Sequence, residues 1–270
     1  MGDWKISSLY FGEGTTIKDF LTFNLDIGLE VDIPYLGFLL QDDKTNILFD
    51  TGISGSYIVD GKAWAGRPSV GGEKYVVESL SEKGLKPRQI DVVIYSHLHN
   101  DHAGNCHLFP QALHVFQKDE WANLIDPLPS QQIRRDFDPA VIPVLKDSNC
   151  LKIHGDMEFR SGLNLYKTPG HTLGSQILQV RAASGSYLLL GDTTPFYCNL
   201  YPKTAEMISW KGQRIKITPA PDVYGPGIPS SMVYDHYAWF DSLYKIKALV
   251  ASPQYAIPGH DPSLVGRVFE

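Results

Sequence analysis

The sequence predicts an α/β protein in which two sheets are sandwiched between helices. Apolar runs typical of strands are mixed along the chain with segments of helical periodicity, and polar residues repeatedly follow the strands. No internal repeat and no low-complexity linker divides the chain, so we expect one domain over residues 1–270. With 43% hydrophobic and 20% charged residues, the composition is ordinary for a globular protein with a sizeable core.

The elements of the first half follow from their apolar patterns. Residues 35–41 and 46–52 are apolar runs on either side of the turn-prone segment DDKT, which predicts a hairpin. Residues 73–84 have apolar positions at helical spacing and end at a glycine that suits the end of a helix. The β-branched run 91–96 predicts a buried strand.

The second half contains further strands and helices. Asp119 and Glu120 favour a helix start, because acidic groups stabilise the first turn of a helix. The predicted elements are strands at 114–117, 163–171 and 186–194, helices at 118–125 and 240–249, and a strand-to-loop segment at 255–261.

Residues 197–235 predict an irregular segment. Its five prolines prevent long regular elements, while its tyrosines and its tryptophan argue against disorder. Two interpretations remain open. The segment is either a surface excursion packed by its own rings, or a substrate-pocket wall, a lid or a subunit contact.

The most distinctive stretch is SHLHNDHAG at 96–104, which directly follows the predicted buried strand. It places His97, His99, Asp101 and His102 within six positions, although the chain has only nine histidines. A folded core gains nothing from such crowding. Neutral imidazole and carboxylate groups suit Zn²⁺, Mn²⁺ or Fe without any thiolate, so the motif predicts a metal site.

Three further candidate ligands follow predicted strands. His171 lies in a TPGH turn, Asp192 ends the apolar run YLLLGD, and His260 lies in PGHD. Taken singly, each has an ordinary alternative, either a capping aspartate or a histidine in a polar turn. Together with the first motif they complete a set for two ions. The expected ligands are His97, His99 and His171 for metal 1, Asp101, His102 and His260 for metal 2, and Asp192 as a bridge between both.

The distribution of charge bears on possible partners. The net charge is −6 and the basic residues are scattered, which leaves no footprint for nucleic acid or an anionic membrane. Apolar runs are far shorter than the ~20 residues that span a bilayer. We therefore expect a small-molecule partner, with neither nucleic acid nor membrane. A homodimer through the apolar segment 20–39 remains open.

Cysteine usage and the amino terminus indicate a compartment. Cys106, Cys150 and Cys198 are odd in number and widely spaced, so they form neither a CxxC pair nor a disulfide framework. The amino terminus lacks the basic and then apolar pattern of a signal peptide. These features predict a cytoplasmic location.

The combined motifs resemble those of the metallo-β-lactamase superfamily. The resemblance rests on HxHxDH at 97–102, FDTG at 49–52, the TPGH turn, the GD strand end and the final GHD, and it covers most of the chain. It implies an αβ/βα sandwich, two mixed sheets flanked by helices, with a dinuclear site along its open edge. Asp50 would lie behind the ligands as a hydrogen-bond acceptor. From the residues alone, Asp50 is a turn former.

Within this superfamily the chain is most similar to N-acyl-homoserine lactone lactonases and related small-lactone hydrolases. Asp192 is unlike true β-lactamases, and His99 in place of Glu argues against flavodiiron oxidoreductases. Only a short segment follows His260, where glyoxalase II carries a helical domain. Two positions depart from the lactonase group. Pro195 replaces a common tyrosine, and Ser175 replaces the second histidine of GHxxGH.

The resemblance implies a dinuclear metal-dependent hydrolase for N-acyl-homoserine lactones or related small or aromatic lactones, a quorum-quenching activity in the first case. Two dications, with Zn²⁺ favoured over Mn²⁺ or Fe, lower the pKa of a bridging water, and the resulting hydroxide attacks the carbonyl carbon. Asp101 is expected to carry the proton to the leaving alkoxide. Tyr197, two positions after Pro195, is expected to steady the oxyanion.

Two alternatives keep the metal ligands and change the function. The same site can hydrolyse a phosphodiester, a thioester or a β-lactam, because a hydroxide between two metals serves those bonds as well. A sensor without catalytic activity would use the site only to hold a ligand.

Overall fold

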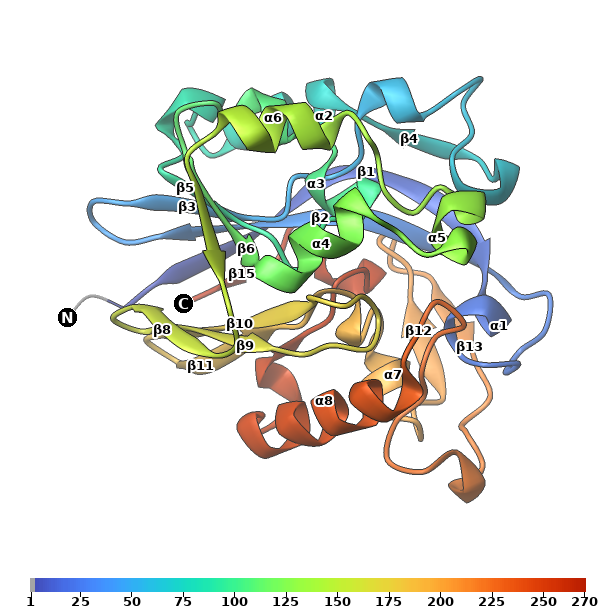
Figure 1. Ribbon diagram of the computed structural model, residues 1–270. Helices are drawn as coiled ribbons and strands as arrows, with labels where there is room; N and C mark the ends of the chain where they lie inside the picture. The colour runs from blue at the N-terminus through green and yellow to red at the C-terminus, as the bar shows by residue number, and fades with distance from the viewer. Residues whose placement is uncertain (1–2) are drawn as a thin grey trace.

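The computed structural model describes residues 3–270 and contains two mixed sheets that pack face to face, with helices on both outer sides (Figure 1). This arrangement confirms the αβ/βα sandwich expected from the sequence. A third, minor sheet pairs β12 (Glu206–Ile208) with β13 (Arg214–Lys216). Among the described residues, no helix is long and apolar enough to cross a membrane.

The larger sheet brings two motif-bearing loops to one edge. Within residues 3–270 it has eight strands in the order β15-β1-β2-β3-β5-β6-β7, with β4 also paired to β1. They are β1 Lys5–Ile17, β2 Glu30–Gln41, β3 Asn46–Phe49, β4 Ser69–Gly71, β5 Val92–Ile94, β6 Leu113–Gln117, β7 Cys150–Ile153 and β15 Val268–Phe269. Because β3 and β5 are parallel and pair Phe49 with Ile94, the FDTG and SHLHNDHAG segments leave the sheet side by side.

The smaller sheet delivers the remaining candidate ligands. Its strands are β8 Met157–Arg160, β9 Leu163–Lys167, β10 Gln176–Ala182, β11 Gly185–Leu189 and β14 Ala256–Ile257, in the order β14-β11-β10-β9-β8. Parallel pairing of Leu189 with Ile257 places the segments after β11 and β14 next to each other. The turn between antiparallel β9 and β10 carries His171.

Helices cover the outer face of each sheet (Figure 1). The helices of the described residues are α1 Lys18–Leu21, α2 Glu73–Glu82, α3 Asn100–Ala103, α4 Lys118–Ile125, α5 Pro129–Arg134, α6 Val141–Asp147, α7 Tyr197–Leu200 and α8 His236–Leu249. Helices α2, α4 and α6 share a buried cluster with the larger sheet, and α8 shares one with the smaller sheet. The sheets therefore bury both of their faces.

Side chains of β2 show how the two core layers arise. Tyr35 and Leu39 pack in the cluster under the helices, while Phe38 and Leu40 pack in the cluster between the sheets. This alternation is the period of two that a strand imposes on its side chains. The apolar residues of segment 20–39 that lie in β2 are consequently buried within this chain, which accounts for their apolarity.

Most predicted elements are confirmed, with shifted ends. The helix predicted at 240–249 begins at His236, because the Asp235 side chain accepts a hydrogen bond from the Ala238 N–H and caps the first turn. The strand predicted at 186–194 ends at Leu189. Strands β1 and β10 were not among the predictions. In β1, glycines and a register shift between Tyr10 and Glu13 interrupt the regular pattern.

The irregular segment 197–235 packs on the amino-terminal part of the chain. The Trp210 ring lies 5.8 Å from the Tyr10 ring between centroids. Met207 and Ile217 pack in one buried cluster with Leu21 of α1. These contacts are made with the amino-terminal part of the chain rather than with the segment's own rings.

The core between the sheets can be tested at Leu178 in β10, which is fully buried. Leu178→Ala is expected to lower the free energy of unfolding by ~2–5 kcal/mol, because it removes buried apolar surface and leaves a cavity. Urea unfolding followed by circular dichroism measures the change. Val223, 88% exposed, provides the control: Val223→Ala is expected to stay within ~0.5 kcal/mol of the wild type. Equal losses in both variants would contradict the assigned core.

Candidate metal centre

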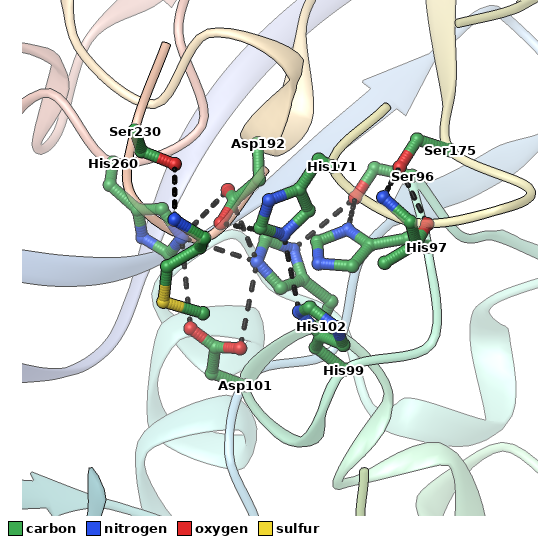
Figure 2. A network of polar contacts seen from close by, with 12 residues as sticks. Ser96, His97, His99, Asp101, His102, His171, Ser175, Asp192, Ser230 and His260 are labelled. Carbon is green, nitrogen blue, oxygen red and sulfur yellow. Dashed lines mark hydrogen bonds and ion pairs between the residues drawn. The ribbon is translucent and has the colours of Figure 1, made fainter. Parts of the chain in front are cut away.

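Seven predicted ligand residues come together at the edge where the two sheets meet (Figure 2). Three ligand groups are recognisable, and within each the possible ligand atoms lie within 4.8 Å of one another. The groups are His97, His99 and His171; His97, His102 and Asp192; and Asp101, His102 and His260. The first and third groups are the two sets that the sequence predicted.

Asp192 lies between the two sets. Its Oδ2 is 3.5 Å from His171 Nε2 in the first set. Its Oδ1 is 2.9 Å from His260 Nε2 and 3.4 Å from His102 Nε2 in the second. One carboxylate oxygen therefore faces each set, which is the geometry of a bridging ligand. The side chain comes from the short turn Gly191–Thr193 that follows β11.

Hydrogen bonds on the far side of the rings set their orientation. His102 Nδ1 donates to Asp50 Oδ2 at 2.8 Å, and His260 Nδ1 donates to the Pro34 carbonyl at 2.8 Å. Both bonds leave Nε2 as the nitrogen that faces the cluster. The expectation that Asp50 is a hydrogen-bond acceptor behind the ligands is thus confirmed. Asp50 also adopts a left-handed backbone conformation, with a φ of 64°.

Ser96 ties Asp50 to the histidine loop. Its backbone N–H donates to Asp50 Oδ1 and its hydroxyl donates to Asp50 Oδ2, each at 2.7 Å. With the hydroxyl hydrogen used in this way, Ser96 Oγ accepts from His97 Nδ1 at 3.0 Å. His97 therefore also presents Nε2, with its lone pair, to the cluster (Figure 2).

The electrostatics of the first set favour neutral imidazoles. Burial is the main cause that lowers the pKa values of His97 and His99 well below the ordinary value. Burial also lowers the pKa of His171 to about 4. These rings are therefore unprotonated at neutral pH, which is the state that binds a metal.

The second set attracts positive charge. Burial opposes protonation of His102, but the carboxylates of Asp101, Asp50 and Asp192 outweigh it and raise the pKa of His102 well above its ordinary value. Burial raises the pKa of Asp101 to about 6. A cation in this set is therefore stabilised by carboxylates that are shielded from water.

Unpaired buried atoms show that the donor set fits metal ions. Within residues 3–270, His97 Nε2 and both carboxylate oxygens of Asp101 are buried without a hydrogen-bond partner. In the first set, His171 Nε2 and His99 Nδ1 approach each other to 3.2 Å. In addition, His102 Nε2 lies only 3.2 Å from His260 Nε2, although Nδ1 of each ring is already a donor. Such groups are costly to bury unless a cation satisfies them.

A cavity of about 670 Å³ opens onto the cluster at His171, Asp192 and His260. Its lining is mostly apolar. The apolar lining residues include Ile17, Phe20, Leu21, Ile33, Ala63, Trp64, Ile133, Pro195, Phe196 and Met232. Ser230 and Met232 come from the segment 197–235, which therefore forms part of the cavity wall.

Tyr197 does not lie with the other predicted site residues. Its hydroxyl donates to the Ala256 carbonyl at 2.9 Å, and its ring packs in the buried clusters around the smaller sheet. It is absent from the cavity lining, which its neighbours Pro195 and Phe196 reach. Because α7 begins at Tyr197, its side chain turns toward β14. The expectation that Tyr197 steadies an oxyanion was wrong.

Tyr35 in β2 is a cavity residue that sequence reasoning missed. It is buried, it lines the cavity, and its hydroxyl lies 2.9 Å from Ser69 Oγ. Burial and the nearby charge of Asp101 raise the pKa of its phenol above the ordinary value. The apolar run around Tyr35 concealed it, although its position directly after Pro34, whose carbonyl holds His260, could have pointed to it.

Curated relatives of the chain include lactonases. The chain is 30% identical over 200 residues to an N-acyl homoserine lactonase of a Bacillus species, covering 70% of this chain and 76% of that protein. It is 28% identical over 201 residues to the N-acyl homoserine lactonase AttM of Rhizobium radiobacter, covering 67% of this chain and 74% of that protein.

Solved structures show the same fold. An N-acyl homoserine lactone hydrolase with its product N-hexanoyl-L-homoserine bound at the catalytic metal centre superposes with a TM-score of 0.76. The identity is 24%, and the match covers 97% of this chain and 95% of that one. The family model described as the metallo-beta-lactamase superfamily matches residues 34–260, from the strand that carries Tyr35 to the last candidate ligand. The chain therefore belongs to the metallo-β-lactamase superfamily.

Proposed function

We propose that residues 1–270 act as one hydrolase domain that opens lactones, with N-acyl homoserine lactones as the first substrate class to test. The observation that carries this proposal is the pair of ligand sets joined by Asp192 at one end of an apolar cavity. The curated relatives, which are N-acyl homoserine lactonases, support the choice of substrate.

The donor set supports two divalent ions per chain, with zinc proposed as the metal. His97, His99 and His171 would hold one ion, Asp101, His102 and His260 the other, and Asp192 would bridge them. Imidazole and carboxylate ligands without thiolates suit Zn²⁺ in a catalytic site. When bound, two such ions supply Lewis acidity toward a carbonyl and lower the pKa of water toward neutrality.

The apolar cavity supports a substrate with a hydrophobic group attached to the lactone. Its volume of about 670 Å³ is within the range of ~300–1,000 Å³ for small-molecule sites. Phe20, Ile33 and Phe196 would contact an acyl chain or an aromatic group. The lactone ring would lie toward His171, Asp192 and His260, where the cavity is polar.

Asp101 is placed to move the proton. It is buried at the base of the cluster, and neither of its oxygens has a hydrogen-bond partner within the described residues. Burial raises the pKa of this carboxyl to about 6. A carboxyl buried beside both ligand sets is within reach of the leaving alkoxide of an opened lactone and can carry a proton to it.

The cysteines support a reducing compartment, for which we infer the cytoplasm. Cys106, Cys150 and Cys198 are all free, and Cys106 and Cys198 are buried. Burial raises the pKa of both buried thiols to about 12, so they remain protonated and unreactive.

The metal requirement gives the main test of the activity. Purified protein is expected to contain about two Zn²⁺ per chain and to open N-acyl homoserine lactones with release of acid, which a pH indicator records. Removal of the metal by a chelator should abolish turnover, and added Zn²⁺ should restore it. A phosphodiester, a thioester and a β-lactam are tested on the same preparation. If one of these is cleaved and no lactone is opened, that compound becomes the proposed substrate class instead of the lactone.

Asp101→Asn tests the proton transfer. The variant keeps an oxygen at the position but cannot carry a proton, so kcat for lactone opening is expected to fall by ~10²–10⁴-fold. Metal content is measured in parallel, because Asp101 is also a candidate ligand. Asp147→Asn, an exposed carboxylate at the end of α6, is the control and should keep the wild-type rate. A fully metallated Asp101→Asn enzyme with a wild-type kcat would exclude the proposed role.

Tyr197→Phe tests the corrected position of Tyr197. The change removes the hydroxyl that donates to Ala256, so the protein is expected to lose ~1–3 kcal/mol of stability by leaving a buried acceptor unpaired. Both kcat and KM should stay unchanged. Lactone kinetics and urea unfolding measure the two effects. A large fall in kcat at unchanged stability would contradict this position and would show that the Tyr197 hydroxyl contacts the substrate.

A further inference from the structure

Glu120 is a fully buried carboxylate that the proposed chemistry does not use. It lies in the first turn of α4 and has 0% exposure. Within the described residues it forms no ion pair with a lysine or an arginine. A carboxylate buried in this way is unfavourable unless hydrogen bonds satisfy it.

Its two oxygens bind two different loops. Oε1 accepts the backbone N–H of Leu98 at 2.9 Å, and Leu98 stands between His97 and His99. Oε2 accepts the Thr172 hydroxyl at 2.6 Å and the Gly174 N–H at 2.9 Å, in the turn that carries His171. Glu120 thus joins the two segments that bring the three residues of the first ligand set together.

The turn around His171 lies directly against α4. A Cβ atom added to Gly174 would lie 2.2 Å from the Glu120 backbone nitrogen, so only glycine permits this approach. Asn123, one turn further along α4, accepts the Leu173 N–H at 3.3 Å. The helix therefore holds this turn through two side chains at i and i+3 spacing, which lie on the same face.

Only a carboxylate satisfies both loops. The Leu98 and Gly174 N–H groups are fixed donors that approach opposite oxygens of Glu120. A glutamine would place its NH₂ group against one of these N–H groups in either orientation. Asp is shorter by one methylene group and would not reach both loops. The observed hydrogen bonds therefore require the chemistry and the length of glutamate.

We propose that Glu120 is a positioning residue that holds His97, His99 and His171 at the spacing of one metal ion, and this proposal rests on the proposed two-metal function. It acts through the loop backbones and touches no ligand ring. The second ligand set is anchored elsewhere, by Asp50 and by the Pro34 carbonyl. Loss of Glu120 should therefore weaken one ion selectively.

Zinc affinity measures this effect without reference to turnover. Metal-free protein is titrated with Zn²⁺ in competition with a colorimetric chelator, which yields two stepwise affinities. Glu120→Gln is expected to weaken one of them by at least ~10-fold and to leave the other near its wild-type value. Asp126→Asn, an exposed carboxylate just after α4, is the matched control and should match the wild type in both steps.

A second variant covers the case in which Glu120→Gln does not fold, as judged by circular dichroism of the metal-free protein. Thr172→Val removes one hydroxyl donor to Glu120 at constant shape and should weaken the same single ion, to a smaller extent. Wild-type affinity for both ions, or equal weakening of both, would overturn the proposal. A wild type that binds two Zn²⁺ but opens no lactone would refute the proposed function and leave this test of Glu120 decisive.

Discussion

The structure depends on one physical constraint: several lone-pair donors must be buried within a few ångströms of one another. His102 and His260 bring their Nε2 atoms to 3.2 Å, and both oxygens of Asp101 lack a hydrogen-bond partner in residues 3–270. Such a cluster is unfavourable in itself, because its unpaired polar atoms have lost water without gaining a hydrogen bond. The surrounding fold must therefore hold these groups in place until cations satisfy them.

The fold meets this constraint by anchoring each ligand segment from behind. Asp50 binds His102 and Ser96, the Pro34 carbonyl binds His260, and Glu120 joins the loop of His97 and His99 to the turn of His171. These anchors come from the end of β3, from β2 and from α4, which are rigid, buried elements of the larger sheet and its helix layer. A site built this way loses little entropy when metal binds, since its ligands are already oriented.

Local motifs were predictable from the sequence, and contacts between distant segments were not. HxHxDH places four candidate ligands within six positions of one loop, so the motif alone predicts a metal site. His171, Asp192 and His260 completed the predicted set. The hairpin at 35–52 and the helix at 118–125 followed from apolar periodicity. Glu120 was visible only as an acidic residue in a first helical turn, because its partners lie in loops distant in sequence. Strand β1 was missed because its glycines and bulge obscure the alternation.

Tyr197 shows how contacts between segments distant in sequence can overturn a functional prediction. Counting residues from Asp192 suggested a phenol at the substrate, but the backbone between them is fixed by other bonds. The Pro195 carbonyl accepts the His260 N–H at 2.9 Å, and the Tyr197 N–H donates to Asp261 Oδ2 at 3.1 Å. Both bonds fasten this segment to the loop of His260, so Pro195 and Tyr197 help to place a ligand residue. Pro195 therefore lines the cavity with apolar surface, while the Tyr197 hydroxyl lies outside the cavity and donates to the Ala256 carbonyl.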